Sequence, residues 1–146
     1  MGFKWDYLGF NKINRKDIRI VLLLLLVSLP ISFVASQVPE IKSFYMLYPL
    51  TVVGALSRLI GMTITEFVFR GVLMFGVFGK TGRKSILLQD IPYMVAHLGK
   101  PILEVPYSGI VGLLFGFIDY RSKSILPSLL LHSIGSEIFI LIVHLL

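Results

Sequence analysis

The length of the apolar stretches constrains this chain more than any other feature. An uninterrupted apolar run extends from Ile20 to Val27, and residues 44–78 contain only three charged side chains. A transmembrane helix needs about 20 consecutive, mostly apolar residues. With 55% hydrophobic residues and a mean hydropathy of +0.85, this chain of 146 residues is far more apolar than a water-soluble domain. It is therefore expected to be an integral, multi-pass membrane protein.

The apolar stretches predict an all-α fold, a polytopic transmembrane helix bundle of about five spans. Residues 44–78 would form a helix roughly 50 Å long, too long for a straight crossing, so a tilt or a break near Gly61 is expected. Residues 37–43 and 99–106 contain prolines and are predicted to be loops. The expected spans are residues 17–36, 44–78, 85–98, 107–120 and 126–146.

Residues 1–16 differ from the rest because they mix aromatic and basic side chains. This composition suits a cytoplasmic or interfacial amphipathic segment that lies in the headgroup region of an anionic leaflet, although a frayed tail would have the same sequence. The domain organisation expected is thus a short interfacial segment, residues 1–16, ahead of one transmembrane bundle, residues 17–146.

The formal charge of +6 is carried by short basic clusters between the apolar stretches. Such clusters are typical of cytoplasmic loops under the positive-inside rule, so the lipid bilayer is an expected partner and no nucleic acid is. Five spans bring residues 4–19, 80–84 and 121–123 to one side, with Lys42 and Lys100 on the other. The N-terminus is therefore predicted to be cytoplasmic and the C-terminus outside, in a prokaryotic plasma membrane.

Two ionisable side chains, Glu66 and Arg70, interrupt the second apolar stretch. Such groups inside a span cost at least about 2.5 kcal/mol each, so they tend to pair and to mark function. Their spacing of four places the carboxylate and the guanidinium on one helix face, where they can pair. The alternative is an ion pair that only joins helices.

Two further sets of polar residues have the same spacing of four and fall on two other predicted helices. Taken singly, such a set is explained by helix packing or by a structural histidine. Three sets on three helices can face one interior, where a carboxylate, two imidazoles and water would suit peptide hydrolysis. The two sets are Gln89, Tyr93 and His97, and Ser128, His132 and Ser136.

The chemistry of a metal site is restricted by composition. The chain has no cysteine, which excludes a thiolate nucleophile and a thiolate metal site. A divalent metal such as zinc would need histidine and carboxylate ligands, and His97 and His132 are the candidate ligands; otherwise no cofactor is expected. Neither H-E-x-x-H nor G-x-S-x-G is present, so the common soluble metalloprotease and serine hydrolase patterns are absent.

Small residues mark one face of the fourth predicted span. Gly109, Gly112 and Gly116 lie on that face, and the last two form a G-x-x-x-G motif. Glycines at this spacing allow helix backbones to approach closely. The motif therefore predicts that the polar helices beside this span are drawn together.

In this order and spacing, the polar motifs resemble those of the CPBP family of intramembrane proteases, which includes the type II CAAX prenyl endopeptidases and proteins linked to bacteriocin processing or self-immunity. The resemblance covers about residues 45–140. It implies that Glu66 and Arg70 match the acidic motif, His97 the second motif and His132 the third. The matching segments are Thr65-Glu66-Phe-Val-Phe-Arg70-Gly71, Tyr93-x-x-x-His97-Leu-Gly-Lys-Pro, Gly112-x-x-x-Gly116 and Ser124-Ile-Leu-Pro-Ser-Leu-Leu-Leu-His132.

Two positions depart from the family pattern. Thr65 occupies the place of the first of two glutamates, and Ser136 the place of a common asparagine. Because the paired glutamates are usually credited with activating water, either Glu66 performs that role alone or the chain binds substrate without cutting it.

Three hypotheses for function follow from these patterns. The first is an intramembrane endopeptidase acting on a membrane-embedded or membrane-associated peptide or protein, in which Glu66 activates water, Arg70 orients Glu66, and His97 and His132 hold a metal or an oxyanion. Tyr93, Thr65 and Ser136 are secondary site residues. The second is a non-catalytic binding or self-immunity protein that keeps the fold. The third is a small transporter or channel subunit, which the lack of an inverted repeat disfavours.

Overall fold

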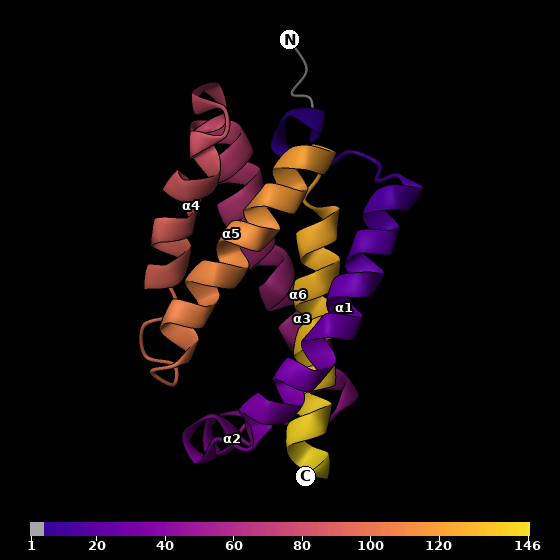
Figure 1. The fold of residues 1–146 in the computed structure, drawn as a ribbon, viewed down its shortest axis with the longest axis vertical. Coiled ribbons are helices and arrows are strands. Elements are labelled where there is room, and N and C mark those ends of the chain that lie inside the picture. The colour runs from indigo at the N-terminus through magenta and orange to yellow at the C-terminus, as the bar shows by residue number, and fades with distance from the viewer. Residues whose placement is uncertain (1–4) are drawn as a thin grey trace.

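The computed structural model describes residues 5–146 and has helices, and no strand, in that range. Figure 1 shows a bundle in which α1 packs beside α6 and α4 beside α5, while α3 and its continuation η2 contact both groups. The predicted all-α bundle is confirmed. Residues 1–4 of the predicted interfacial segment lie outside the described residues. The elements are η1 (Trp5–Leu8), α1 (Arg15–Ser36), α2 (Pro39–Tyr45), α3 (Val52–Glu66), η2 (Phe67–Val77), η3 (Gly79–Thr81), α4 (Lys84–Val95), α5 (Glu104–Ser122) and α6 (Leu126–Leu145).

The first long helix, α1, begins with a capping box. The Asn14 side chain accepts hydrogen bonds from the backbone N–H groups of Lys16 and Asp17 at 2.8 and 3.1 Å, and the Asp17 carboxylate accepts one from the Asn14 N–H at 3.2 Å. These bonds satisfy N–H groups that a helix start otherwise leaves free. Pro30 lies inside the helix, as lipid-embedded helices allow.

Residues 37–43 are not the loop that the sequence pattern predicted, because the short helix α2 begins at Pro39. Proline suits the first turn of a helix, where its missing N–H costs no hydrogen bond. The Tyr45 hydroxyl donates to Glu104 Oε2 at 2.7 Å and so joins α2 to the start of α5. Burial, together with the Glu104 carboxylate, raises the pKa of Tyr45 well above its ordinary value, so this phenol stays protonated.

The sequence predicted a tilt or a break near Gly61, and the break is wrong, because Gly61 lies within α3. The long apolar stretch is interrupted earlier, between α2 and α3, and Thr51 caps the new helix by accepting the Gly54 N–H at 3.1 Å. From Val52 to Val77 the helix is continuous, but it changes from α to π geometry after Glu66. Single turns of π-helix occur often at functional sites.

Three of the described helices are long and apolar enough to cross a membrane: α1, α3 with η2, and α6. The prediction of five spans also includes α4 and α5. With 12 residues, α4 is only about 18 Å long, shorter than the roughly 30 Å hydrocarbon core. The loop that follows α4 reaches α2, where the Ile102 N–H donates to Glu40 Oε1 at 3.3 Å.

The two ends of the bundle differ in charge. The N-terminal segment is joined to the connection between α5 and α6, because the Asn11 amide donates to the Lys123 carbonyl at 2.7 Å and the Ile125 N–H to the Gly9 carbonyl at 2.9 Å. The η3 connection lies at this same end in Figure 1, whereas α2 and the C-terminus lie at the other. The three basic clusters of the sequence therefore collect at one end of the molecule.

Candidate active site

Glu66 is the last residue of α3, at the point where the helix becomes a π-helix, and its side chain is completely buried. Arg70, one turn later, is equally buried, and its Nε lies 3.3 Å from Glu66 Oε2. A buried charge is tolerated when a partner of opposite charge compensates it. The pairing that the spacing of four predicted is therefore present, and it places a carboxylate in the interior of the bundle.

Arg70 is held by two other helices. Its Nη2 donates to the Gly112 carbonyl of α5 at 3.4 Å, and its Cζ lies 4.0 Å from the centre of the Tyr93 ring of α4. A guanidinium over an aromatic ring gains a cation–π attraction, which is strongest away from water. Arg70 thus connects Glu66 to both helices of the α4 and α5 pair.

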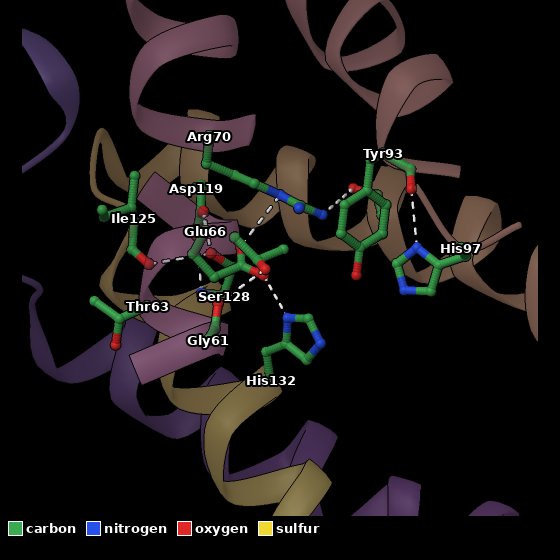
Figure 2. Close-up of polar contacts among 12 residues, drawn as sticks. Gly61, Thr63, Glu66, Arg70, Tyr93, His97, Asp119, Ile125, Ser128 and His132 are labelled. Atoms are coloured by element: carbon green, nitrogen blue, oxygen red, sulfur yellow. Dashed lines mark hydrogen bonds and ion pairs between the residues drawn. The ribbon is translucent and has the colours of Figure 1, made fainter. Parts of the chain in front are cut away.

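The third residue around Glu66 is His132, from α6. Its Nδ1 lies 2.5 Å from Glu66 Oε1, so His132 and Arg70 contact different carboxylate oxygens of Glu66, as Figure 2 shows. The His132 side chain is 17% exposed whereas that of Glu66 is fully buried, so the imidazole is the part of this pair that meets the surroundings. Residues 66 positions apart in the sequence are thus brought into contact.

His97 lies on the other side of Tyr93. Its Nδ1 is 2.9 Å from the Tyr93 carbonyl oxygen, and the two ring centres are 4.7 Å apart. The His132 ring lies 6.4 Å from the Tyr93 ring, and in Figure 2 the free nitrogens of the two histidines are turned toward the space between their rings. Tyr93 therefore contacts both predicted histidines, and the two imidazoles lie near the same space.

Both histidines line the same cleft, which has a volume of about 640 Å³. Thr65 lines it as well and donates its hydroxyl to the Gly61 carbonyl at 2.9 Å. The position where the family pattern has a first glutamate therefore lines the same cleft as the two imidazoles, but it carries a hydroxyl. Ser136 is half-buried one turn after His132 and is not among the described residues that line the cleft.

The hydrogen bonds fix which ring nitrogens carry protons. The Tyr93 carbonyl only accepts, so His97 Nδ1 is the donor; the Glu66 carboxylate likewise accepts from His132 Nδ1. In the neutral rings both Nε2 atoms then hold a free lone pair. They suit a base, an acceptor or a metal ligand, whereas the oxyanion role predicted for neutral imidazoles would require a protonated ring.

A metal ion would find only part of a ligand set here. Within residues 5–146, no group of three or more histidine, aspartate or glutamate side chains is arranged to hold one. A catalytic zinc ion ordinarily has three protein ligands, and the Nε2 atoms of His97 and His132 supply two. The described residues therefore do not fit the predicted zinc, and the chemistry below is carried by side chains.

Asp119 is a buried residue near Glu66 that the sequence pattern did not reveal. Its two oxygens accept the Ser128 N–H at 3.0 Å and the Ser128 hydroxyl at 2.5 Å. Because Ser128 lies in the first turn of α6, the Asp119 carboxylate also lies near the positive end of the α6 dipole, where a negative charge is stabilised. Asp119 stands beside Arg121 at the end of a predicted span, where a charge is ordinary, so nothing in the sequence distinguished it.

A second ion pair at the cleft was also missed. Arg58 Nε and Nη2 donate to the two Glu137 oxygens, each at 2.7 Å, and Arg58 Nη1 donates to the Pro49 carbonyl at 3.0 Å. Arg58 lines the cleft and joins α3 to α6. The partners are 79 residues apart, beyond the reach of any helical spacing rule.

The glycines of α5 have the role that their spacing predicted. A Cβ on Gly112 would overlap Asp90 Oδ1 and lie 2.7 Å from the Tyr93 ring, and one on Gly116 would lie 2.9 Å from Gln89 Nε2. Only glycine lets α4 approach α5 this closely. The approach places Tyr93 against Arg70.

The comparison with protein families agrees with this arrangement. The family model described as "Type II CAAX prenyl endopeptidase Rce1-like" matches residues 42–136, more than half of the chain. No curated protein and no solved structure gives a significant match. Glu66, Arg70, His97 and His132 all fall within the matched residues. The chain therefore belongs to the Rce1-like type II CAAX prenyl endopeptidase family, among the CPBP intramembrane proteases.

Proposed function

We propose that this chain is an intramembrane endopeptidase that hydrolyses a peptide bond with a water molecule activated by Glu66 and His132 together. The observation that supports this most strongly is the 2.5 Å contact between Glu66 Oε1 and His132 Nδ1, beside a cleft that His97 also lines. A buried carboxylate behind an imidazole that faces a cleft is an arrangement suited to general base catalysis.

The reaction requires a proton acceptor and then a proton donor. Water attacks the carbonyl carbon of the substrate while His132 Nε2 takes one of its protons, and the Glu66 carboxylate stabilises the imidazolium that forms. As the carbon–nitrogen bond breaks, the same proton passes from Nε2 to the leaving nitrogen. The products are one carboxylic acid and one amine, and His132 returns to its neutral form.

Arg70 and His97 assist in different ways. Arg70 neutralises the second oxygen of Glu66, which keeps the carboxylate charged in the apolar interior and turned toward His132. The free lone pair of His97 Nε2 accepts a hydrogen bond from the attacking water or from the substrate amide. A protonated His97 would instead donate to the oxyanion.

The proposal includes the location and the orientation of the protein in the membrane. The charge distribution supports an orientation with the N-terminus and the basic clusters in the cytoplasm. The plasma membrane of a prokaryotic cell is part of the same proposal. The substrate is a peptide or protein held in or at the bilayer, and the surrounding lipid is the second partner.

Substitution of the histidines tests the mechanism. Detergent-solubilised protein is incubated with a membrane peptide mixture, and new termini are identified by mass spectrometry. We expect His132→Ala and His97→Ala each to lower cleavage by about 100-fold or more, and the double variant to lose little more, because groups acting as one unit are not additive. Elemental analysis of each variant measures whether either change also removes bound metal.

The third histidine provides a matched control. His144 Nδ1 contacts the Ile140 carbonyl at 2.9 Å, the same contact that His97 makes with Tyr93, but at the far end of α6. His144→Ala should cleave at the wild-type rate. Equal losses in all three single variants, or none in any, would contradict the proposed site.

A second function, substrate binding without cleavage, is favoured by Thr65, which places a hydroxyl in the cleft where the family pattern has a carboxylate. The variant Thr65→Glu distinguishes cleavage from binding without cleavage. If Glu66 and His132 are the base, the wild type cleaves and Thr65→Glu changes the rate by less than about 10-fold. An inactive wild type that becomes active in Thr65→Glu would identify a binding or self-immunity protein with a degenerate site.

A further inference from the structure

One face of α5 contacts two residues of the candidate site. Gly112, Phe115 and Asp119 lie on that face, because residues three, four and seven positions apart share one side of a helix. The Gly112 carbonyl accepts the hydrogen bond from Arg70 Nη2 at 3.4 Å. The centre of the Phe115 ring lies 5.9 Å from that of His132 and 5.8 Å from Arg70 Cζ. The same helix face therefore touches both side chains that contact the catalytic carboxylate.

The start of α6 is capped from that face of α5. The N-cap residue of α6, Ile125, makes no side-chain cap hydrogen bond, and Pro127 in the first turn has no N–H group. The Ser128 N–H donates to Asp119 Oδ1 at 3.0 Å, and the Ser128 hydroxyl donates to Asp119 Oδ2 at 2.5 Å. A carboxylate of another helix thus has the role that an N-cap side chain ordinarily has within its own helix.

The bonds to Asp119 lie one helical turn before His132. Ser128 and His132 are four residues apart, so they share one face of α6 and move together when the start of that helix moves. Figure 2 shows Ser128 beside Glu66, which His132 Nδ1 contacts at 2.5 Å. Two carboxylates therefore hold the same face of α6, Asp119 at its first turn and Glu66 at its second.

Asp119 is placed to act on the site only through α6. It is completely buried, and it is not among the described residues that line the cleft. Within residues 5–146, no lysine, arginine or histidine nitrogen lies within ion-pair distance of its carboxylate. The two bonds from Ser128 satisfy both of its oxygens, as burial of a polar group requires. Any effect of Asp119 on cleavage therefore passes through Ser128.

We infer that Asp119 is a positioning residue, which sets the place of His132 against Glu66 by capping α6 through Ser128. The inference rests on the proposed function for its effect on cleavage. The place of His132 is a property of the folded protein and is measured without a substrate.

Hydrogen bonding, and not charge, carries this effect, and two substitutions separate the two properties. Asp119→Asn keeps both contacts, because its side-chain oxygen accepts the Ser128 N–H while its amide donates to the Ser128 oxygen. The Ser128 hydroxyl then donates to the Ile125 carbonyl, which lies at 3.1 Å. Asp119→Leu has a similar volume and keeps neither contact.

Nuclear magnetic resonance of the imidazoles measures the position of His132. A proton held between an imidazole nitrogen and a carboxylate at short distance resonates far downfield, so the Nδ1–H resonance in protein labelled with [15N]histidine reports the contact with Glu66. The full-length protein in detergent contains three histidines, and His97→Ala and His144→Ala assign the resonance by elimination. Asp17→Leu is the matched control, because Asp17 is a buried carboxylate that caps α1.

Cleavage is measured on the same proteins with the peptide of the membrane peptide mixture that the wild type cleaves fastest. We expect Asp119→Leu to shift or remove the His132 resonance and to lower kcat by at least about 10-fold with KM within about threefold, because a displacement of about 1 Å can cost about 100-fold in rate. Asp119→Asn should keep the resonance and cleave within about threefold of wild type. Asp17→Leu should lower the midpoint of thermal unfolding and leave the resonance in place.

Ser128→Ala is the second variant if Asp119→Leu does not fold, and it should shift the His132 resonance in the same direction. An unmoved resonance in the folded variants of either residue, or equal losses in Asp119→Asn and Asp119→Leu, would overturn the inference. A resonance that moves as expected in a protein that cleaves no peptide would reject only the proposed catalysis. Wild-type cleavage and an unmoved resonance in Asp119→Leu would reject only the positioning.

Discussion

At the scale of single residues, Glu66 is supported from three helices. Arg70 compensates its charge from the next turn, His132 contacts it from α6, and Tyr93 of α4 holds Arg70 in place. The spacing of four predicted the first contact because both residues lie on one helix. The second could only be expected from the presence of three polar stripes, since a contact between residues 66 apart depends on how the helices pack.

Arg70 has a testable structural role. Arg70→Ala leaves the Glu66 carboxylate uncompensated in a completely buried position, which should cost roughly 3 to 5 kcal/mol of unfolding free energy. We expect a large fall in the midpoint of thermal unfolding in detergent and a loss of cleavage. Arg83→Ala, in the η3–α4 connection, is the control for loss of one positive charge. Unchanged thermal stability in Arg70→Ala would mean that the ion pair does not stabilise the fold.

At the scale of elements, most helices could be predicted from apolar run length, and the errors have local causes. Pro39 was interpreted as a loop residue, although proline also starts helices, and α2 begins there. Gly61 was interpreted as a break, but an isolated glycine is tolerated within a helix, and the sequence gives no sign of the change to π geometry after Glu66. The ion pair between Arg58 and Glu137 was missed because it links two elements.

The contact between α4 and α5 offers a matched pair of glycines. In Gly112→Ala the new methyl group would lie 2.7 Å from the buried Tyr93 ring, whereas in Gly109→Ala it would meet the flexible Met94 side chain at 3.1 Å. Gly112→Ala should therefore destabilise the protein by about 1 to 3 kcal/mol and lower cleavage, because Tyr93 has to move away from Arg70. Gly109→Ala should stay near wild type. Thermal unfolding of both variants measures this difference in stability. Equal stability would argue against close packing at Gly112.

At the scale of the whole molecule, successive long helices run in opposite directions along the bundle, although three of the described helices satisfy the length and composition of a span. The alternation brings the basic clusters to one end, as the charge pattern predicted. Sequence alone left open what packs against that end. The answer lies in η1 and the residues that follow it. They pack on η2, and Asn11 bonds to the connection between α5 and α6, 112 and 113 residues away in the sequence.

The same segment explains why a small bundle can hold a polar interior. The N-terminal residues cover η2, the element that carries Arg70, since the Leu8 carbonyl oxygen would lie 3.2 Å from a Cβ on Gly71. The proposed chemistry depends on the contact between Glu66 and His132 inside this bundle.

The most direct test of that claim compares cleavage by purified wild-type, Glu66→Gln and Glu66→Asp proteins in detergent, with folding monitored by thermal unfolding. Glu66→Gln removes the negative charge behind His132, and Glu66→Asp keeps the charge beside Arg70 but withdraws it from the imidazole by one methylene group. We predict that the cleavage rate falls by about 100-fold or more in Glu66→Gln and by at least about 10-fold in Glu66→Asp, with Glu66→Asp still folded. Cleavage at the wild-type rate by folded Glu66→Gln protein would contradict the proposed mechanism.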